Sequence, residues 1–373
     1  MFSLRGEYVF AIFLLIFWLA IYLLSKIINL KKHGLIILPF FIRYNSDGFK
    51  RALYKCSRRW RAFWKIFSYI SVILGFSFMI FALVFLAGNL VNLFLSREEG
   101  VPVSIVVPGL TLSLYWLPYF LISVVLVVFI HEAAHGIISL AEGISIKSAG
   151  MLLLAVFPGG FVEIEEEKMD ALKTSSKLKI FSAGASANVL SGLLIFLTIF
   201  TLFIQAPSGI VVMEVVEGGP LDLAGVKRWD VIYALNGTLV HEYRDLADFM
   251  VRVKPGERLV VATSRGNFTI STIPSPEDKD KAIIGIMLPS LLYYPSRLNL
   301  GFFWDVQTYL LLNWLFIISI NVAIFNMLPI PALDGDKFLQ CLLQGFSEKS
   351  VLIKKFFNIF SLFLITINIA LSL

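Results

Sequence analysis

The stretch Val127-Val128-Phe129-Ile130-His131-Glu132-Ala133-Ala134-His135-Gly136 is an apolar run that contains two histidines and one glutamate. A charged group at the centre of a bilayer costs roughly 2.5–3.5 kcal/mol, so such polar groups need compensation. On a helix, residues i and i+4 lie about 40° apart on one face, so His131 and His135 can bind one metal ion. Glu132 lies beside that face and can take a proton from a metal-bound water. The alternative is an internal polar cluster without a metal.

The overall composition excludes an ordinary soluble domain. The chain has 373 residues, is 58% hydrophobic and has a mean hydropathy of +0.82, which is typical of a multi-span membrane protein. The net charge of +6 is concentrated in one segment. This concentration indicates orientation in a membrane and argues against nucleic-acid binding. Cys56 and Cys341 lie far apart in the sequence, so we interpret them as unpaired thiols.

Apolar runs predict about six transmembrane helices. We expect them at about 8–25, 66–95, 114–141, 180–204, 303–326 and 353–372. The first run is long for a signal-peptide core and lacks a small-residue cleavage site, so we interpret it as a retained anchor.

The charge pattern predicts the orientation of these helices. Residues 26–65 carry 11 Lys and Arg side chains against Asp47 alone. By the positive-inside rule this loop stays in the cytoplasm, which places the N-terminus outside. His131 would then lie roughly 26 Å from the outer end of its helix, in the cytoplasmic half of the membrane. Gly143 can end this helix in a left-handed cap.

The stretch 149–162 is apolar but too short to span a bilayer, and Pro158-Gly159-Gly160 interrupts it. These features predict a re-entrant or interfacial β-hairpin. Irregular backbone at membrane depth is tolerated only beside protein or a cavity. We therefore expect this hairpin to lie against the rest of the protein or along a cavity.

Two further polar residues lie in apolar surroundings. Asn188 ends a run of small residues that lets another helix approach closely; its spacing does not decide between an interhelical hydrogen bond and a functional donor. Asp334 follows Pro329 and Pro331, which end the preceding helix. A buried carboxylate needs a cation, and a metal would supply it. The alternative for Asp334 is a cap on the next helix.

Residues 206–290 differ in composition from the rest of the chain. Charges and turns appear there, with short alternating strands expected at 209–216, 231–235, 258–264 and 267–273 and a helix at about 244–252. This pattern predicts a soluble α+β module, on the outer face by the count of spans.

Four motifs together resemble the site-2 protease family of intramembrane zinc metalloproteases, over about residues 100–340. They are His131-Glu132-Ala133-Ala134-His135, the segment from Gly184 to Asn188, the hairpin stretch Phe157–Val162, and Leu333-Asp334-Gly335 with Asn326 and Pro329-Ile330-Pro331 ahead of it. The resemblance implies one Zn²⁺ per chain, held by His131, His135 and Asp334, with Glu132 as the general base. It also implies substrate or oxyanion contacts for Asn188, Asn326, Gly159 and Gly160. Asp336 stands where a second glycine follows the family's Leu-Asp-Gly, so it is a competing ligand candidate.

The soluble module resembles a PDZ domain of the bacterial arrangement. Gly218–Val226 and Asp230–Gly237 match its two best-known stretches, and Trp229 departs from them by replacing a glycine. The resemblance places the carboxylate-binding loop at Gly209, Ile210, Val211 and Val212. Such a module would bind a peptide C-terminus or filter substrates.

The expected protein is therefore a polytopic α-helical membrane protein with an inserted PDZ domain and a re-entrant hairpin. We expect four parts: 1–112 (first two spans and basic loop), 113–205 (first part of the catalytic core), 206–290 (PDZ domain) and 291–373 (rest of the core and last span). The expected function is hydrolysis of peptide bonds within or next to the transmembrane segments of membrane-protein substrates. The alternatives are a proteolytically inactive adaptor or chaperone that uses the PDZ domain, and another zinc protease whose third ligand is a glutamate.

Overall fold

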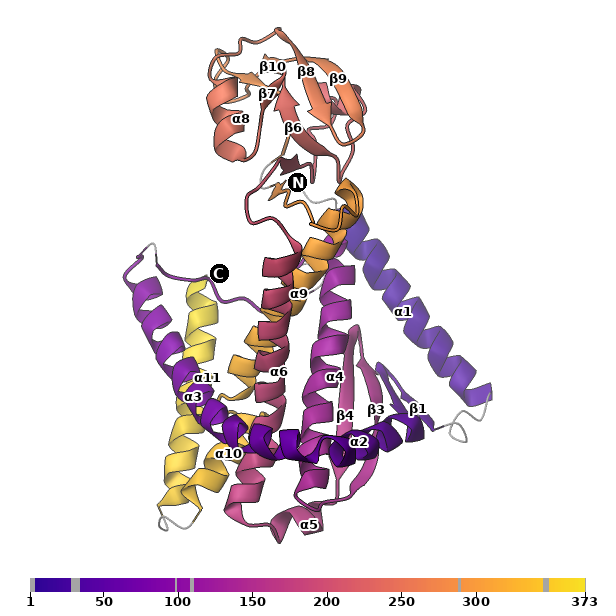
Figure 1. The fold of residues 1–373 in the computed structure, drawn as a ribbon, viewed down its shortest axis with the longest axis vertical. Helices are drawn as coiled ribbons and strands as arrows, with labels where there is room; N and C mark the ends of the chain where they lie inside the picture. The colour runs from indigo at the N-terminus through magenta and orange to yellow at the C-terminus, as the bar shows by residue number, and fades with distance from the viewer. Residues whose placement is uncertain are drawn as a thin grey trace. The chain divides into compact units, whose positions relative to one another are not determined.

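The computed structural model describes residues 4–27, 34–97, 99–107, 111–287, 290–344 and 349–372. These residues contain 6 helices that are long and apolar enough to cross a membrane. They are α1 (Leu4–Ile27), α3 (Arg61–Phe94), α4 (Leu117–Ala141, with a 3-10 turn before it at Leu114–Trp116), α6 (Thr174–Leu202), α9 (Phe302–Asn326) and α11 (Ser350–Ser372). The predicted polytopic helical fold with an inserted α+β region is confirmed (Figure 1).

The chain forms two compact units. One comprises Met1–Leu193 and Trp314–Leu373, and the other comprises Leu194–Asn313. In the first unit, three shorter helices accompany the long ones: α2 (Asp47–Arg59), α5 (Glu166–Asp170) and α10 (Asp334–Leu343). Its core forms where α3, α4, α6, α10 and the end of α9 pack together.

The helix α4 ends as its sequence predicts. Gly143 has φ of +89°, the left-handed conformation that favours glycine. The N–H of Ile144 donates to the carbonyl of Ser139 at 2.9 Å, and the N–H of Gly143 donates to the carbonyl of Leu140 at 3.2 Å. This pair of bonds satisfies the last carbonyls of the helix and turns the chain back toward the sheet.

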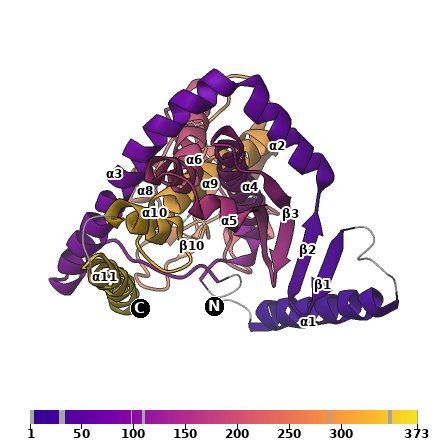
Figure 2. The ribbon, with the colours of Figure 1, turned by 90° about the horizontal axis from the view of Figure 1, so that it is seen from below.

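A four-stranded antiparallel sheet of order β1-β2-β3-β4 lies beside α4 (Figure 2). Its strands are β1 (Leu35–Leu38), β2 (Phe41–Asn45), β3 (Ile146–Leu154) and β4 (Phe157–Ile164). The hairpin expected at 149–162 is thus β3–β4. The sequence did not predict its partner strands: the apolar piece at 35–42, too short to span a bilayer, pairs with β3 through β2.

The turn of the hairpin does not coincide with the Pro-Gly-Gly break inside the stretch. It lies at Ala155, which has φ of +53°, and Val156, whereas Pro158-Gly159-Gly160 lies inside β4. The physical reason is that β4 is the edge of the sheet, where a proline can stand without a missing ladder bond. The Pro-Gly-Gly segment therefore shapes an open strand edge.

Between the end of α6 and the start of α9, the second unit contains short antiparallel strands and the helices α7 and α8. Its main sheet has the order β12-β5-β6-β8-β9, with β7 paired to β6. The elements are β5 (Ile210–Val211), α7 (Pro220–Leu223), β6 (Val231–Leu235), β7 (Thr238–Leu239), α8 (Tyr243–Met250), β8 (Arg258–Thr263), β9 (Gly266–Ser271), β10 (Ile273–Pro274), β11 (Ala282–Ile283) and β12 (Leu291–Leu292). An apolar core lies between the sheet and α8; it includes Ile210, Leu221, Ile232, Leu235, Leu246 and Leu259.

Candidate metal centre

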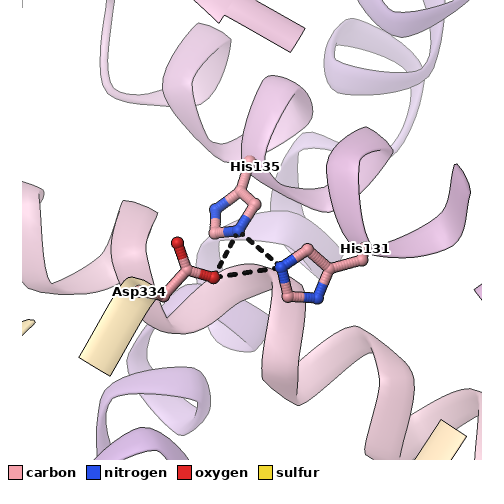
Figure 3. A group of neighbouring side chains, drawn as sticks. All are labelled: His131, His135 and Asp334. Carbon is pink, nitrogen blue, oxygen red and sulfur yellow. Dashed lines mark hydrogen bonds and ion pairs between the residues drawn. The ribbon is translucent and has the colours of Figure 1, made fainter. Parts of the chain in front are cut away.

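Three side chains from two distant parts of the chain converge at one point (Figure 3). His131 and His135 lie one turn apart on α4, and their Nε2 atoms are 3.1 Å from each other. The Oδ2 atom of Asp334 lies 3.0 Å from Nε2 of His131 and 2.9 Å from Nε2 of His135. His131 is buried, and the side chains of His135 and Asp334 are 14% and 17% exposed.

The turn after α9 brings Asp334 to the histidines. The prolines that follow Asn326 stop the helix, and the chain reverses through buried Met327 and Leu328 into α10. Asp334 is the first residue of α10, yet its carboxylate reaches the imidazoles. A Cβ on Gly335 would overlap the carbonyl oxygen of Met327, so only glycine allows this reversal.

The helix α6 approaches the two imidazoles closely because residue 184 is glycine. A Cβ added to Gly184 would lie 2.5 Å from Nε2 of His131 and closer still to Nε2 of His135. Within the small-residue run at the start of this helix, Gly184 is the position at which a side chain would collide with the imidazoles. The absence of a side chain at Gly184 leaves room for the histidine rings.

Hydrogen bonds on the far side of each ring set the histidine orientation. Nδ1 of His135 lies 2.7 Å from the carbonyl oxygen of Ile180, which can only accept, so Nδ1 carries the proton and the neutral ring keeps a lone pair on Nε2. The side-chain amide of Asn188 lies 3.1 Å from Nδ1 of His131. Its Oδ1 atom is buried and has no partner in the described structure, and a rotation of the amide would offer that oxygen to an Nδ1–H.

The donor set fits a tetrahedral zinc site. Zinc bonds imidazole nitrogen and carboxylate oxygen at about 2.0–2.2 Å, so ligand atoms in tetrahedral geometry are about 3.3 Å apart. The three separations here are 2.9, 3.0 and 3.1 Å. Two nitrogen lone pairs and a carboxylate oxygen that face one another repel unless a cation lies between them. Three protein ligands of this kind are the set that zinc enzymes use.

Glu132 lies next to this triangle. It follows His131 on α4, and its Oε2 atom accepts a hydrogen bond of 3.1 Å from the backbone N–H of Val162 on β4. Glu132, His135 and Asp334 all line one cavity of about 450 Å³. The cavity thus holds a carboxylate acceptor, two of the three convergent side chains and the edge of β4.

Comparison with known proteins decides the family. The model of peptidase family M50 matches residues 119–368, which include both histidines, Glu132 and Asp334. This chain belongs to peptidase family M50. It is thus a metalloendopeptidase of the site-2 protease type. The six long apolar helices of the described residues make it a multi-pass membrane protein.

Three relatives illustrate the breadth of this similarity. The uncharacterized protein MJ0971 of Methanocaldococcus jannaschii is 31% identical over 331 residues, which cover 86% of this chain and 81% of that protein. The membrane-bound transcription factor site-2 protease homolog of Arabidopsis thaliana is 27% identical over a region that covers 52% of this chain and 39% of the length of that protein. The zinc metalloprotease RasP of Geobacillus kaustophilus is 26% identical over a region that covers 45% of this chain and 50% of the length of that protein.

The structure places the remaining site candidates of this M50 peptidase individually. The amide nitrogen of Asn326 lies 2.9 Å from both His131 Nε2 and Asp334 Oδ2, at the rim of the triangle. Asp336, the competing ligand candidate, contacts Lys354 at 3.0 Å and Asn358 at 2.9 Å on α11 instead.

The two candidate glycines of the hairpin differ in surroundings. A Cβ on Gly160 would lie 3.6 Å from Cβ of Glu132, so Gly160 packs directly over the His-Glu helix. A Cβ on Gly159 would instead meet the Leu152 side chain at 3.0 Å, on the neighbouring strand. Of these two glycines, Gly160 alone borders Glu132.

The predicted PDZ loop is part of the sheet in the second unit. Ile210 and Val211 pair with β6 on one side and with β12 on the other, and Gly209 and Val212 also donate backbone hydrogen bonds. Ile210, Val211 and Val212 are at most 1% exposed. These residues therefore have no free edge for a peptide. The edge strand next to β5 is β12, which lies beside a cavity of about 300 Å³ lined by Leu291, Leu292, Tyr243 and Tyr309, among others.

Trp229 adopts the turn conformation for which the PDZ pattern has a glycine. Its φ is +74°, in the left-handed region, and its N–H donates to the carbonyl of Val212 at 2.8 Å. The next residue, Asp230, accepts hydrogen bonds of 2.6 Å from Arg265. These contacts hold the turn in a conformation that costs a non-glycine residue about 1–2 kcal/mol.

Sequence reasoning missed some contributors to the site. The carbonyl of Ile180 carries no side-chain signal, and the need for Gly335 depends on a contact with Met327 that only the fold creates. The β2 residues Phe41 and Arg43 line the same cavity as Glu132 but lie more than 85 positions from it in the sequence. Their placement follows from strand pairing between β2 and β3.

Proposed function

We propose that this protein hydrolyses peptide bonds within or next to transmembrane segments of other membrane proteins, with one zinc ion held by His131, His135 and Asp334. The observation that carries the proposal is the convergence of two Nε2 atoms and Asp334 Oδ2 within 3.1 Å of one another, beside Glu132 in one cavity. Bound zinc supplies Lewis-acid chemistry that polarises the scissile carbonyl and acidifies the attacking water.

Glu132 acts as general base and then as general acid. Its carboxylate faces the cavity, so it can accept a proton from the attacking water and return it to the leaving amine. The bond from the Val162 N–H holds one carboxylate oxygen in a fixed direction and leaves the other oxygen for proton transfer. This arrangement supports a catalytic role for Glu132 rather than a role as a fourth ligand.

Asn188 and Asn326 have different roles in this proposal. The contact between Asn188 and Nδ1 of His131 supports a positioning role, in which the amide orients a ligand ring. Asn326 lies on the opposite side of His131, with its amide nitrogen at the ligand triangle. From there it can donate a hydrogen bond to the substrate carbonyl or to the oxyanion that forms from it.

The edge of β4 is the proposed substrate track. Because Val162 points its N–H away from β3 and toward Glu132, the strand period also directs the backbone groups of Gly160 and Pro158 to the open side. A substrate helix hides its carbonyls in i→i−4 bonds and must unwind before attack. The unwound segment can add to the β4 edge as a strand, which brings its backbone beside Glu132. Substrates rich in helix-weakening residues should therefore be cleaved best.

The second unit is proposed to be a PDZ-like module that filters substrates. The open edge of β12, the neighbouring helix α8 and the apolar cavity between them suit an extended peptide with an apolar side chain. The hydroxyl of Tyr243, which is buried and has no hydrogen-bond partner in the described structure, is available to a peptide carboxylate or carbonyl. Deletion of residues 206–290 should then loosen substrate selectivity and leave zinc binding intact.

The orientation in the membrane is part of the proposal. The basic segment 26–65 supports a cytoplasmic position for that loop. We therefore propose that the N-terminus and residues 206–290 are outside. The metal centre then lies toward the cytoplasmic half. Labelling of single cysteines placed in each loop of intact cells would check this orientation.

The direct test of the function is Glu132→Gln. This substitution keeps the shape of the side chain and removes its ability to accept a proton. We expect undiminished zinc content and at least 100-fold slower cleavage of membrane-embedded proteins, detected as missing fragments in membrane proteomics. Unchanged fragment patterns would contradict the proposed role and would favour an adaptor that does not cleave.

A further inference from the structure

One face of α2 carries a row of exposed basic side chains. Arg51, Lys55, Arg58 and Arg59 are exposed, and none of them forms an ion pair with a residue that the structure describes. Arg61 and Lys65 extend the row into α3 and are also exposed. The only acidic residue between positions 26 and 65 is Asp47. The row therefore has no compensation from its own segment.

Packing fixes the direction of this basic face. The opposite face of α2 is buried: Leu53 is 3% exposed and Ser57 is 7% exposed. At 100° per residue, the four basic side chains of α2 lie about 140–240° around the helix from Leu53. The helix cannot rotate them toward the protein without exposing its apolar side. They must face whatever surrounds the protein at this level.

The same helix is joined to the zinc helix at the height of the metal centre. The Leu53 side chain lies against Gly136, where an added Cβ would be only 3.1 Å away. The Ser57 hydroxyl donates to the carbonyl of Ile137 at 3.3 Å, and the rings of Phe49 and Phe129 lie 4.5 Å apart. Figure 1 shows α2 crossing the lower part of α4. The basic face and the metal ligands thus share one level along the helix axis.

The segment after the basic row is apolar and aromatic. Trp60 is 60% exposed, Phe63 is 46% exposed and Ile66 is 63% exposed, at the start of the membrane-spanning helix α3. A tryptophan between a basic surface and an apolar helix is typical of the boundary between headgroups and acyl chains. The order along the chain is therefore basic face, aromatic boundary, hydrocarbon-spanning helix.

We propose that the basic face of α2 binds the anionic phosphate headgroups of lipids in one leaflet. These cations are fixed in direction, lie at the boundary of a membrane-spanning helix and have no acidic partner among the described residues. Such a surface matches a negatively charged lipid surface. Because α2 packs across residues 129–137, the bound headgroup layer lies at the level of His131 and His135. The lipid contact does not depend on the proposed catalytic mechanism.

Lipid retention by the full-length protein tests this proposal without any need for cleavage. The protein is purified in micelles that contain equal amounts of phosphatidylglycerol and phosphatidylcholine, and native mass spectrometry counts the lipids that remain bound. We expect the wild type to retain phosphatidylglycerol preferentially. Combined replacement of Arg51, Lys55, Arg58 and Arg59 by Gln should lower that preference by about fivefold or more.

Two controls separate the surface from net charge and from misfolding. The first replaces four exposed cations of the second unit, Arg252, Lys254, Arg258 and Lys279, by Gln; it removes the same charge and should keep the preference. The second changes Arg51, Arg58 and Arg59 to Lys, which conserves charge and should also keep it. Equal retention of both lipids by the wild type would overturn the proposal and point to an acidic protein partner. So would loss of the preference in the first control, or its survival in the four-residue α2 variant.

Discussion

Replacement of Gly184 by alanine tests the close approach of α6 to the metal ligands. The new methyl group would lie 2.5 Å from Nε2 of His131 and closer to Nε2 of His135, whereas carbon makes ordinary contacts at about 3.5–4.0 Å. Either α6 moves away by about 1 Å or the imidazoles turn. Zinc sites tolerate displacements of only about 0.2 Å. We therefore expect the zinc affinity to fall by about 100-fold or more, which corresponds to about 2.7 kcal/mol.

The assay is competition between the full-length protein and chelators of graded zinc affinity. Gly88→Ala is the matched control, because a Cβ at Gly88 in α3 meets nothing within 4 Å and alanine favours a helix. The control should bind zinc as the wild type does. A Gly184→Ala protein with zinc affinity within twofold of the wild type would refute the packing argument, and with it the placement of the ligand atoms beside α6.

Three further outcomes follow from the structure. Asn188→Leu removes the partner of His131 Nδ1 and should lower zinc affinity by about 10–100-fold; unchanged affinity with slower cleavage would instead support an oxyanion role. Replacement of Pro158 and Gly159, or of Gly160 by Leu, should reduce cleavage without loss of zinc, because these changes alter the β4 edge; unchanged rates would remove the hairpin from the mechanism. The Ser148 hydroxyl, Arg43 and Lys147 hold the pKa of Glu163 at about 2, below its ordinary value. A lowered pKa stabilises the fold above about pH 5 and loses that effect as the pH falls toward 2; the thermal midpoint of the wild type should therefore fall more between about pH 6 and pH 3 than that of Glu163→Gln, and parallel curves would contradict this.

The membrane-spanning helices and the group formed by His131, His135 and Asp334 could be predicted because their signals are local or unusual. Long apolar runs specify helices in a bilayer regardless of tertiary context. Histidines four residues apart in such a run share a helix face, and Asp334 is an acid in an apolar segment. An apolar run in water and an unpaired polar side chain in an apolar segment are both unfavourable. Few folds of this sequence avoid both.

The β1–β2 strands and the α2 helix could not be predicted, because their structure depends on distant partners. The strand Phe41–Asn45 is stabilised by pairing with β3, about 100 residues later. The buried face of α2 is narrow and consists of Leu53 and Ser57. It cannot be recognised as a packing surface until the fold brings Gly136 against Leu53. The turn at Ala155 was missed because Pro-Gly-Gly is a stronger local turn signal than Ala-Val.

The central claim is that His131, His135 and Asp334 bind one zinc ion. X-ray absorption at the zinc edge, with metal content, on purified full-length protein tests it most directly. The account predicts one zinc per chain with nitrogen and oxygen ligands at about 2.0–2.2 Å, and loss of this signal in Asp334→Ala and His135→Ala. Full zinc content with an unchanged spectrum in Asp334→Ala would contradict it.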